Sequence, residues 1–147
     1  MPSWIKQYVV AVLVFCLVDL VWLTVIASDL YDEQLGDLLA EQPNVAAAVA
    51  FYALFVAGLV YFVIHPAVSS GSWKRALLSG AFFGLVTYAA WDLTNLAVLD
   101  GFPASLVAID LAWGTFLAAT VSLATYAIVS LLPGHNRSPG SGSSVAR

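Results

Sequence analysis

Residues 8–27 read YVVAVLVFCLVDLVWLTVIA, twenty residues in which Asp19 is the only carboxylate and no Lys or Arg occurs. A helix needs about 20 apolar residues to cross a hydrocarbon core of ~30 Å, so this stretch predicts a transmembrane helix. The alternative is a cleaved signal peptide, since Val25 and Ala27 form a small-residue cleavage site. The stretch exceeds the ~7–15 apolar residues of such leaders. It also carries Asp19 and Trp22, so we expect the helix to be retained.

Three more apolar runs follow, at residues 44–64, 76–99 and 104–132. Across its 147 residues the chain is 61% hydrophobic and only 10% charged, whereas soluble domains carry about 25% charged residues. We therefore predict an all-α membrane protein, with four transmembrane helices forming one domain over residues 1–132. His65-Pro66 is expected to end the second helix, because proline lacks the N–H that continues a helix.

The basic residues predict the orientation of these helices in the membrane. Lys and Arg accumulate in cytoplasmic connections. The connections at 28–43 and 100–103 carry acidic residues and neither Lys nor Arg. Both termini are therefore expected to be cytoplasmic, with these two connections on the outer side. The basic residues precede the first run (Lys6), separate the second from the third (Lys74, Arg75) or follow the fourth (Arg137, Arg147).

Two further segments have their own pattern. In the first connection, Ser28 or Asp29 is expected to cap a short amphipathic helix on the outer membrane surface. The alternative is a flexible acidic loop. Residues 133–147 are rich in Gly, Ser and Pro and predict a disordered cytoplasmic tail. The helix prediction for the connection rests on the near-helical spacing of Leu30, Leu35, Leu38 and Leu39.

Three carboxylates lie inside apolar runs, where an aspartate costs about 2.5–3.5 kcal/mol on insertion scales. At ~1.5 Å per residue, Asp19 lies ~17 Å from the inner boundary of the core. The same estimate gives ~24 Å for Asp92 and ~21 Å for Asp110. All three therefore fall in the outer half of the membrane, within about two helical turns of one another.

A short repeat surrounds two of these acids. Asp19-Leu-Val-Trp22-Leu-Thr24 and Asp110-Leu-Ala-Trp113-Gly-Thr115 share the pattern Asp-Leu-x-Trp-x-Thr. The spacing of three places Asp and Trp on one helical face. Because the two helices run in opposite directions, Trp22 is level with Asp110 and Trp113 with Asp19. If these helices pack together, each indole N–H can donate to the carboxylate of the other helix.

The third helix extends the predicted site with Trp91 and Asn95, which share a face with Asp92. The candidate ligand- or ion-binding residues are Asp19, Trp22, Trp91, Asp92, Asn95, Asp110 and Trp113. No Lys, Arg or His lies in the outer half of any run. The carboxylates therefore either hold protons or bind a cation or a basic ligand group.

Three readings of this polar site stay open. It binds or moves a proton, a cation or a small amphiphile, and transport by only four helices would need a homo-oligomer. It is a clamp that holds the bundle of an accessory or scaffold protein together. It belongs to a membrane-embedded enzyme acting on lipid, with carboxylates in acid–base roles.

Several function classes lack their signature in the sequence. There is no nucleotide loop, no Cys/His metal spacing and no Ser/His/Asp set. We therefore predict no cofactor, no metal and no catalytic residue. Five Lys and Arg residues and a net charge of −4 exclude a nucleic-acid partner on charge grounds. The lipid bilayer is the one partner that the composition requires.

Four separated motifs, in order, resemble the small bacterial membrane family catalogued as domain of unknown function 2177. The resemblance covers about residues 5–132 and implies a protein of the bacterial inner membrane. It implies no activity. The motifs are Asp19-Leu-Val-Trp22, Tyr31-Asp-Glu-Gln-Leu-Gly36, Tyr88-Ala-Ala-Trp-Asp-Leu-Thr-Asn-Leu-Ala97 and Asp110-Leu-Ala-Trp-Gly114.

Overall fold

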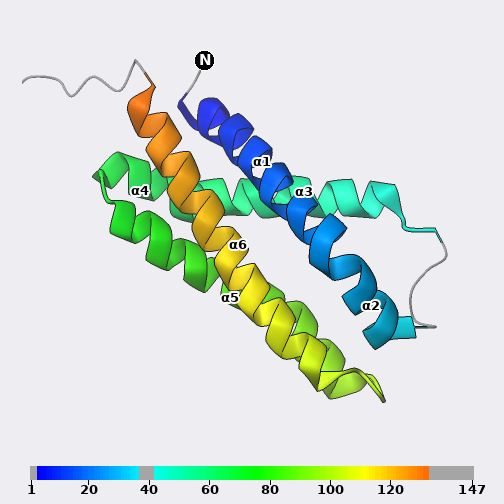
Figure 1. The fold of residues 1–147 in the computed structure, drawn as a ribbon. Helices are drawn as coiled ribbons and strands as arrows, with labels where there is room; N and C mark the ends of the chain where they lie inside the picture. Colours follow the sequence, from blue (N-terminus) through cyan, green and yellow to red (C-terminus); the bar gives the residue numbers. More distant parts are fainter. Residues whose placement is uncertain (1–2, 37–41, 133–147) are drawn as a thin grey trace, which may run out of the picture.

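The computed structural model describes residues 3–36 and 42–132, and these form helices and short connections without a strand (Figure 1). Four helical stretches are long and apolar enough to cross a membrane: Ser3–Val25, Val45–Ser70, Trp73–Val98 and Ala104–Leu131. The predicted all-α architecture with four membrane helices is thus confirmed. The elements are α1 (Ser3–Trp22), a π-helical turn η1 (Leu23–Ala27), α2 (Ser28–Leu35), α3 (Val45–Leu59), a second π-helical turn η3 (Val60–Ile64), α4 (His65–Ser70), α5 (Trp73–Val98) and α6 (Ala104–Leu131).

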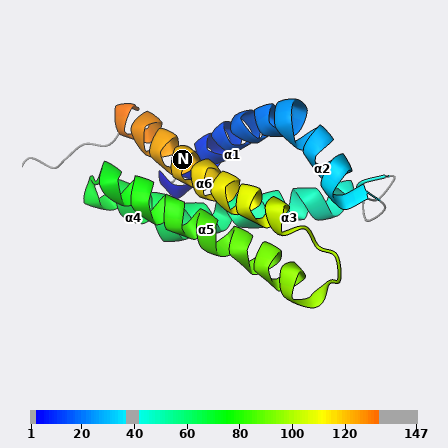
Figure 2. The ribbon, with the colours of Figure 1, turned by 60° about the horizontal axis from the view of Figure 1, so that its bottom comes forward.

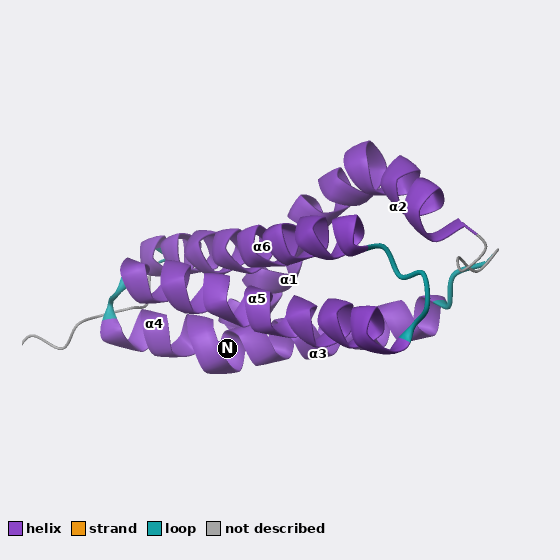
Figure 3. Cartoon of the chain, turned by 90° about the horizontal axis from the view of Figure 1, so that it is seen from below, coloured by secondary structure: helices purple, strands orange, loops and turns teal. Residues whose placement is uncertain are grey.

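The helices form a bundle in which α5 and α6 run antiparallel, side by side, and α3 crosses behind α1 and α6 (Figure 1). Figures 2 and 3 show α2 at the same end of the bundle as the connection between α5 and α6. The start of α1 and the α4–α5 turn lie toward the other end. The described part of the first acidic connection, α2, therefore lies at the same end of the bundle as the second.

Glycines bring α5 and α6 into close contact. A Cβ added at Gly84 would collide with the Gly114 carbonyl, and one at Gly80 would lie 2.7 Å from the Ser122 hydroxyl. Small residues let membrane helices approach closely enough for their backbones to touch. The Gly-x-x-x-Gly of α5 therefore sets the spacing of the two helices that carry Asp92 and Asp110.

The π-helical turns correct two predictions about helix ends. The expected cap at Ser28 or Asp29 is wrong: Ala27 is already helical (φ −76°, ψ −32°), so α2 continues from α1 through η1. His65-Pro66 does not end the second helix, which continues through α4 to Ser70. Proline's missing N–H falls where η3 has already changed the hydrogen-bond register, so the helix passes it without a break.

The helix start after the first connection agrees with the sequence. Asn44 caps α3, where its side chain accepts a hydrogen bond of 3.0 Å from the Ala47 backbone N–H. The predicted short helix is present as α2, but Leu38 and Leu39 lie outside the described residues. The predicted tail at 133–147 also lies outside them.

Among the buried residues that are described, polar groups occur near the two ends of the bundle, with an apolar band between them. Asp19, Asp92 and Asp110 lie in the halves of α1, α5 and α6 that are nearer to α2, whereas Gln7, Ser122 and Thr125 lie in the opposite halves of α1 and α6. The band itself is a single apolar core that joins α1, α3, η3 and α6. Its largest members include Phe15, Phe55, Leu59 and Leu117.

Candidate functional site

Asp19 lies on the buried face of α1 and is held by donors from two other helices. The Tyr52 hydroxyl on α3 donates to its Oδ2 at 2.8 Å. The Trp113 indole on α6 also hydrogen-bonds this carboxylate. Phe15 packs edge-on against Tyr52, with ring centroids 5.1 Å apart, and so fixes the direction of the phenol. Asp19 is thus a hydrogen-bonded carboxyl group at the junction of α1, α3 and α6.

Asp110 is held from outside the membrane helices. The Tyr31 hydroxyl on α2 donates to its Oδ1 at 2.8 Å. Burial, and then the neighbouring Asp110 charge, raise the pKa of the Tyr31 phenol, so Tyr31 remains a donor at neutral pH. A second link joins the same two helices, where the Ser105 hydroxyl donates to Gln34 Oε1 at 2.8 Å. Two side-chain hydrogen bonds therefore attach α2 to α6.

Asp92 on α5 is fully buried, and neither of its oxygens accepts a hydrogen bond from a donor group among the described residues. Its polar neighbour is the Asp110 carboxyl. Two like charges in neighbouring buried positions disfavour each other. Asp92 and Asp110 are therefore a neighbouring acid pair in which two negative charges are costly.

Tyr88 connects the pair to the single acid. Its phenol lies within electrostatic range of Asp19, Asp92 and Asp110. Gly114 makes room for it, since a Cβ there would collide with the Tyr88 ring. The described residues form no group of three acidic, His or Cys side chains with metal-site spacing. The three carboxylates are thus a pair and a separate single group, with Tyr88 between them.

The two tryptophans of the repeat meet, a contact that was not predicted from the sequence. Trp22 and Trp113 stack with ring centroids 4.2 Å apart and planes inclined by 9°. Trp113 bonds Asp19, as expected for one half of the reciprocal pattern. Trp22 instead interacts with the Tyr31 hydroxyl, which itself occupies Asp110. The prediction that Trp22 donates to Asp110 was wrong, because Tyr31 on α2 is the donor to this carboxyl and lies outside the repeat.

The remaining candidates lie around Asp92. Trp91 is 66% exposed and lines a cavity that Asp110 also lines. The Asn95 side-chain nitrogen is buried without a hydrogen-bond partner in the described part of the chain. The repeat threonines stay out of the site: Thr24 and Thr115 donate to the Leu20 and Leu111 carbonyls of their own helices, at 2.7 Å each.

Two adjoining cavities open onto these acids. The smaller, about 200 Å³, has Asp19 on its wall, and the larger, about 580 Å³, has Asp110. Tyr31, Phe51 and Tyr88 line both, so they form the partition between them. The larger cavity is completed mainly by apolar side chains: Leu35, Thr87, Trp91, Phe102 and Leu106.

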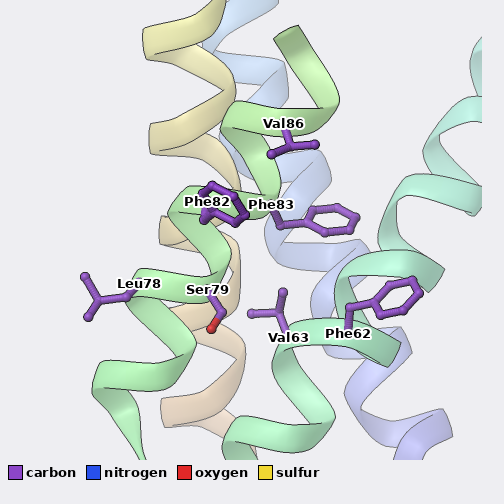
Figure 4. Close-up of a pocket in the computed structure, with 7 residues that line it drawn as sticks. All are labelled: Phe62, Val63, Leu78, Ser79, Phe82, Phe83 and Val86. Carbon is purple, nitrogen blue, oxygen red and sulfur yellow. The ribbon is translucent and has the colours of Figure 1, made fainter. Parts of the chain in front are cut away.

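A third cavity, about 470 Å³, has a different character (Figure 4). It lies between α5 and η3, and Phe62, Phe82 and Phe83 are among its walls, with Ser79 as the one polar side chain among the described lining residues. The other two cavities combine aromatic walls with a carboxylate. The candidate binding site is therefore at the α2 end.

Comparison with known protein families matches residues 4–127 to a family described as predicted membrane protein, domain of unknown function 2177. The chain belongs to this family. No curated protein matches the chain. No solved structure matches it either.

In this member of the domain of unknown function 2177 family, two side chains that contact the candidate site, Tyr31 and Tyr52, were not predicted from the sequence. Tyr31 lies in the second family-like motif, but its position in a connection gave no reason to place it against Asp110. Tyr52 follows the start of the second apolar run by eight residues, which places it ~12 Å from the outer boundary of the core. In a core of ~30 Å this is ~18 Å from the inner boundary, close to the ~17 Å estimated for Asp19. A search for hydrogen-bond donors at the depth of Asp19 would therefore have found Tyr52.

Proposed function

We propose that this protein binds a small amphiphile with a positively charged head group, in the two cavities beside Asp19 and Asp110. The observation that carries the proposal is a cavity of about 580 Å³ whose walls are mainly apolar and in which Asp110 is the one carboxylate among the described lining residues. Ligand pockets typically measure ~300–1,000 Å³ and combine apolar walls with a few convergent polar groups. An apolar tail and a charged head match those two kinds of wall.

The sign of the charge follows from the groups around the site. Three carboxylates lie here, and the described basic side chains Lys6, Lys74 and Arg75 lie on elements toward the other end of the bundle (Figure 1). A buried carboxylate is stabilised by a cation or by hydrogen-bond donors. The described residues supply phenol and indole donors to Asp19 and Asp110, but no cation. A cationic ligand supplies the missing charge.

The clamp reading also has an observation in its favour. Tyr52 joins α3 to α1 through Asp19, and Tyr31 joins α2 to α6 through Asp110. Hydrogen bonds between membrane helices contribute about 0.6–2 kcal/mol each. Both roles are compatible in one molecule, because an ionised carboxylate has about four acceptor sites, of which the Tyr52 and Tyr31 hydroxyls occupy one on Asp19 and one on Asp110. The clamp reading by itself, however, gives no reason for a cavity beside each acid.

Catalysis on lipid and transport across the membrane have less support. For an enzyme acting on lipid, the one aliphatic hydroxyl among the described lining residues of the two cavities is that of Thr87, which donates to the Phe83 carbonyl at 2.8 Å. For proton or ion transport, the described buried core has an apolar band between Asp110 and Ser122, which are ~18 Å apart along α6. The homo-oligomer that transport would need stays a prediction.

We further propose that the protein lies in the bacterial inner membrane with both termini in the cytoplasm. The charge asymmetry of the described residues supports this: Lys6, Lys74 and Arg75 are toward one end, and the acids of α2 and Asp100 are at the other. The binding site then faces the outer leaflet, from which an amphiphile reaches it without crossing the membrane. Attachment of a membrane-impermeant label to a cysteine in the α5–α6 connection of intact cells tests this orientation.

The binding proposal is tested with two probes that differ in head-group charge. Dodecylamine, which is protonated at pH 7, and dodecanol are added to bilayer nanodiscs at equal mole fraction, and native mass spectrometry counts the molecules retained by the protein. We expect the amine to be retained about tenfold better, which corresponds to ~1.4 kcal/mol. Asp110→Asn should remove most of this preference, and Asp100→Asn, at an exposed acid in the α5–α6 connection, should leave it intact.

Equal retention of the amine and the alcohol by the wild-type protein would contradict the proposal. An equal loss of amine retention in Asp110→Asn and Asp100→Asn would also contradict it. If Asp110→Asn lowers the stability of the folded protein but leaves amine retention unchanged, the clamp reading replaces it.

A further inference from the structure

The smaller cavity has the composition of an aromatic cage. Six of its nine lining residues are aromatic, and Asp19 is the one carboxylate among them. At about 200 Å³ it is smaller than the ~300–1,000 Å³ of whole-ligand pockets, so it suits a head group. Its aromatic residues are Trp22, Tyr31, Phe51, Tyr52, Tyr88 and Trp113.

The hydrogen bonds already made inside this cavity restrict the kind of cation it accepts. Asp19 accepts from Tyr52 at 2.8 Å and also from Trp113. The Tyr31 hydroxyl is directed to Asp110, at 2.8 Å. A primary ammonium brings three N–H donors that need acceptors. Two of the roughly four acceptor sites of Asp19 are therefore already occupied before a primary ammonium enters.

A quaternary ammonium makes no such demand. It has no N–H donor, and it is attracted by the negative faces of aromatic rings, most strongly by tryptophan. Such cages are a common means of recognising choline-type groups and methylated lysine. Asp19 adds a negative charge that needs no direct hydrogen bond to the ligand. Resting on the proposed function, we infer that the head group is a quaternary ammonium seated in the cage beside Asp19.

The neighbouring cavity supplies room for the rest of the ligand. The two cavities share Tyr31, Phe51 and Tyr88, so a head group beside Asp19 places its alkyl chain next to the larger, apolar space. The acid pair is chemically different, because both Asp92 oxygens lack a donor group among the described residues. A primary amine therefore suits Asp110 and Asp92 better, and a quaternary ammonium suits the cage.

The inference is tested with dodecyltrimethylammonium and dodecylamine in nanodiscs of lipids without choline head groups, again at equal mole fraction. We expect the wild-type protein to retain the quaternary probe about tenfold better than the primary amine. Trp113→Leu should abolish that preference while amine retention persists. Trp73→Leu removes a ring of the same kind at the other end of α5 and should have no effect.

Tyr52→Phe separates the two reasons for the preference, which are the attraction of the cation by the aromatic rings and the occupied acceptor sites of Asp19. It keeps the ring and removes the hydroxyl that occupies Asp19 Oδ2. The freed acceptor should improve retention of the primary amine, so the preference for the quaternary probe narrows severalfold without loss of quaternary binding. If Trp113→Leu does not fold, Tyr52→Phe and Trp113→Phe carry the test, the latter with a weakened preference expected.

The retention experiment distinguishes failure of the cage inference from failure of the proposed function. Equal retention of the two cations, both well above dodecanol, overturns the cage inference and leaves the proposed function standing. Retention of neither cation above dodecanol overturns both. A quaternary preference that survives Trp113→Leu or Trp113→Phe unchanged also overturns the cage.

Discussion

Removing the Tyr31 hydroxyl tests how α2 is attached to the bundle. Two side-chain hydrogen bonds join α2 to α6: Tyr31 donates to Asp110 and Ser105 donates to Gln34, both at 2.8 Å. Tyr31→Phe breaks the first and keeps the ring. Ser105→Ala breaks the second. Because α2 continues from α1 through a π-helical turn, its opening need not unfold the membrane helices.

The expected magnitudes differ because the acceptors differ. A hydrogen bond to a charged acceptor contributes about 1.5–3 kcal/mol, and one between neutral groups about 0.5–1.5 kcal/mol. At one factor of ten for each ~1.4 kcal/mol, Tyr31→Phe should raise the local opening of α2 about 10- to 100-fold. Ser105→Ala should raise it about 2- to 10-fold. If Asp110 is protonated, its carboxyl is a neutral acceptor, and Tyr31→Phe should then raise the local opening of α2 only about 2- to 10-fold.

Amide hydrogen exchange in nanodiscs, resolved by segment, measures this opening. Faster exchange should be confined to α2 and η1, with α5 and α6 unchanged. Tyr61→Phe is the matched control, since it makes the same substitution at an exposed tyrosine on η3. Unchanged exchange in α2, or an equal increase across all four membrane helices, would refute the proposed attachment.

Three further outcomes are expected. Gly114→Ala places a Cβ in the Tyr88 ring and should lower the free energy of unfolding by about 1–3 kcal/mol in denaturant titrations, more than Gly58→Ala, whose Cβ meets only the far end of a ring. Because burial and the nearby acid raise the pKa of folded Tyr31 above its usual value of 10.0, the stability of the wild-type protein should fall as the pH rises above that value. Unfolding measured from pH 8 to 11 should show a smaller decline for Tyr31→Phe. Proteoliposomes should dissipate an imposed pH gradient no faster than empty liposomes, and a flux that Asp19→Asn abolishes would contradict the binding proposal.

Depth along the membrane was predictable from the sequence, and rotation about each helix was not. Counting residues placed Asp19, Asp92 and Asp110 within two turns of one another, and the antiparallel repeat brought Trp22 level with the acid of the other helix. The same count cannot say which faces meet. The structure therefore divides the acids into a pair and a single group, with Tyr88 between them.

The donors to the acids were the least predictable part of the site. Tyr31 reaches Asp110 only because η1 carries α1 into α2 without a cap, and a sequence that starts with Ser-Asp favours a new helix start there. Tyr52 reaches Asp19 because α3 crosses α1 at the level of Phe15. Both contacts depend on how helices cross, which is a property of the packed bundle and not of any local pattern.

The placement of the buried polar groups favours binding over conduction. A path for protons needs donors and acceptors within hydrogen-bonding distance of one another along its length, or water between them. In the described core, Asp110 is separated from Ser122 by twelve residues of α6, or ~18 Å. Trp113, the residue of α6 beside Asp19, is separated from Ser122 by nine residues, or ~14 Å. Buried side chains such as Phe15, Leu59 and Leu117 lie at the level between them. An apolar band of this thickness excludes water, because each water needs two or more polar partners. In the proposed function, the same band keeps the charged head group of the ligand at the end where it entered, beside the carboxylates and aromatic walls. Such a barrier suits a binding site and interrupts a conducting path.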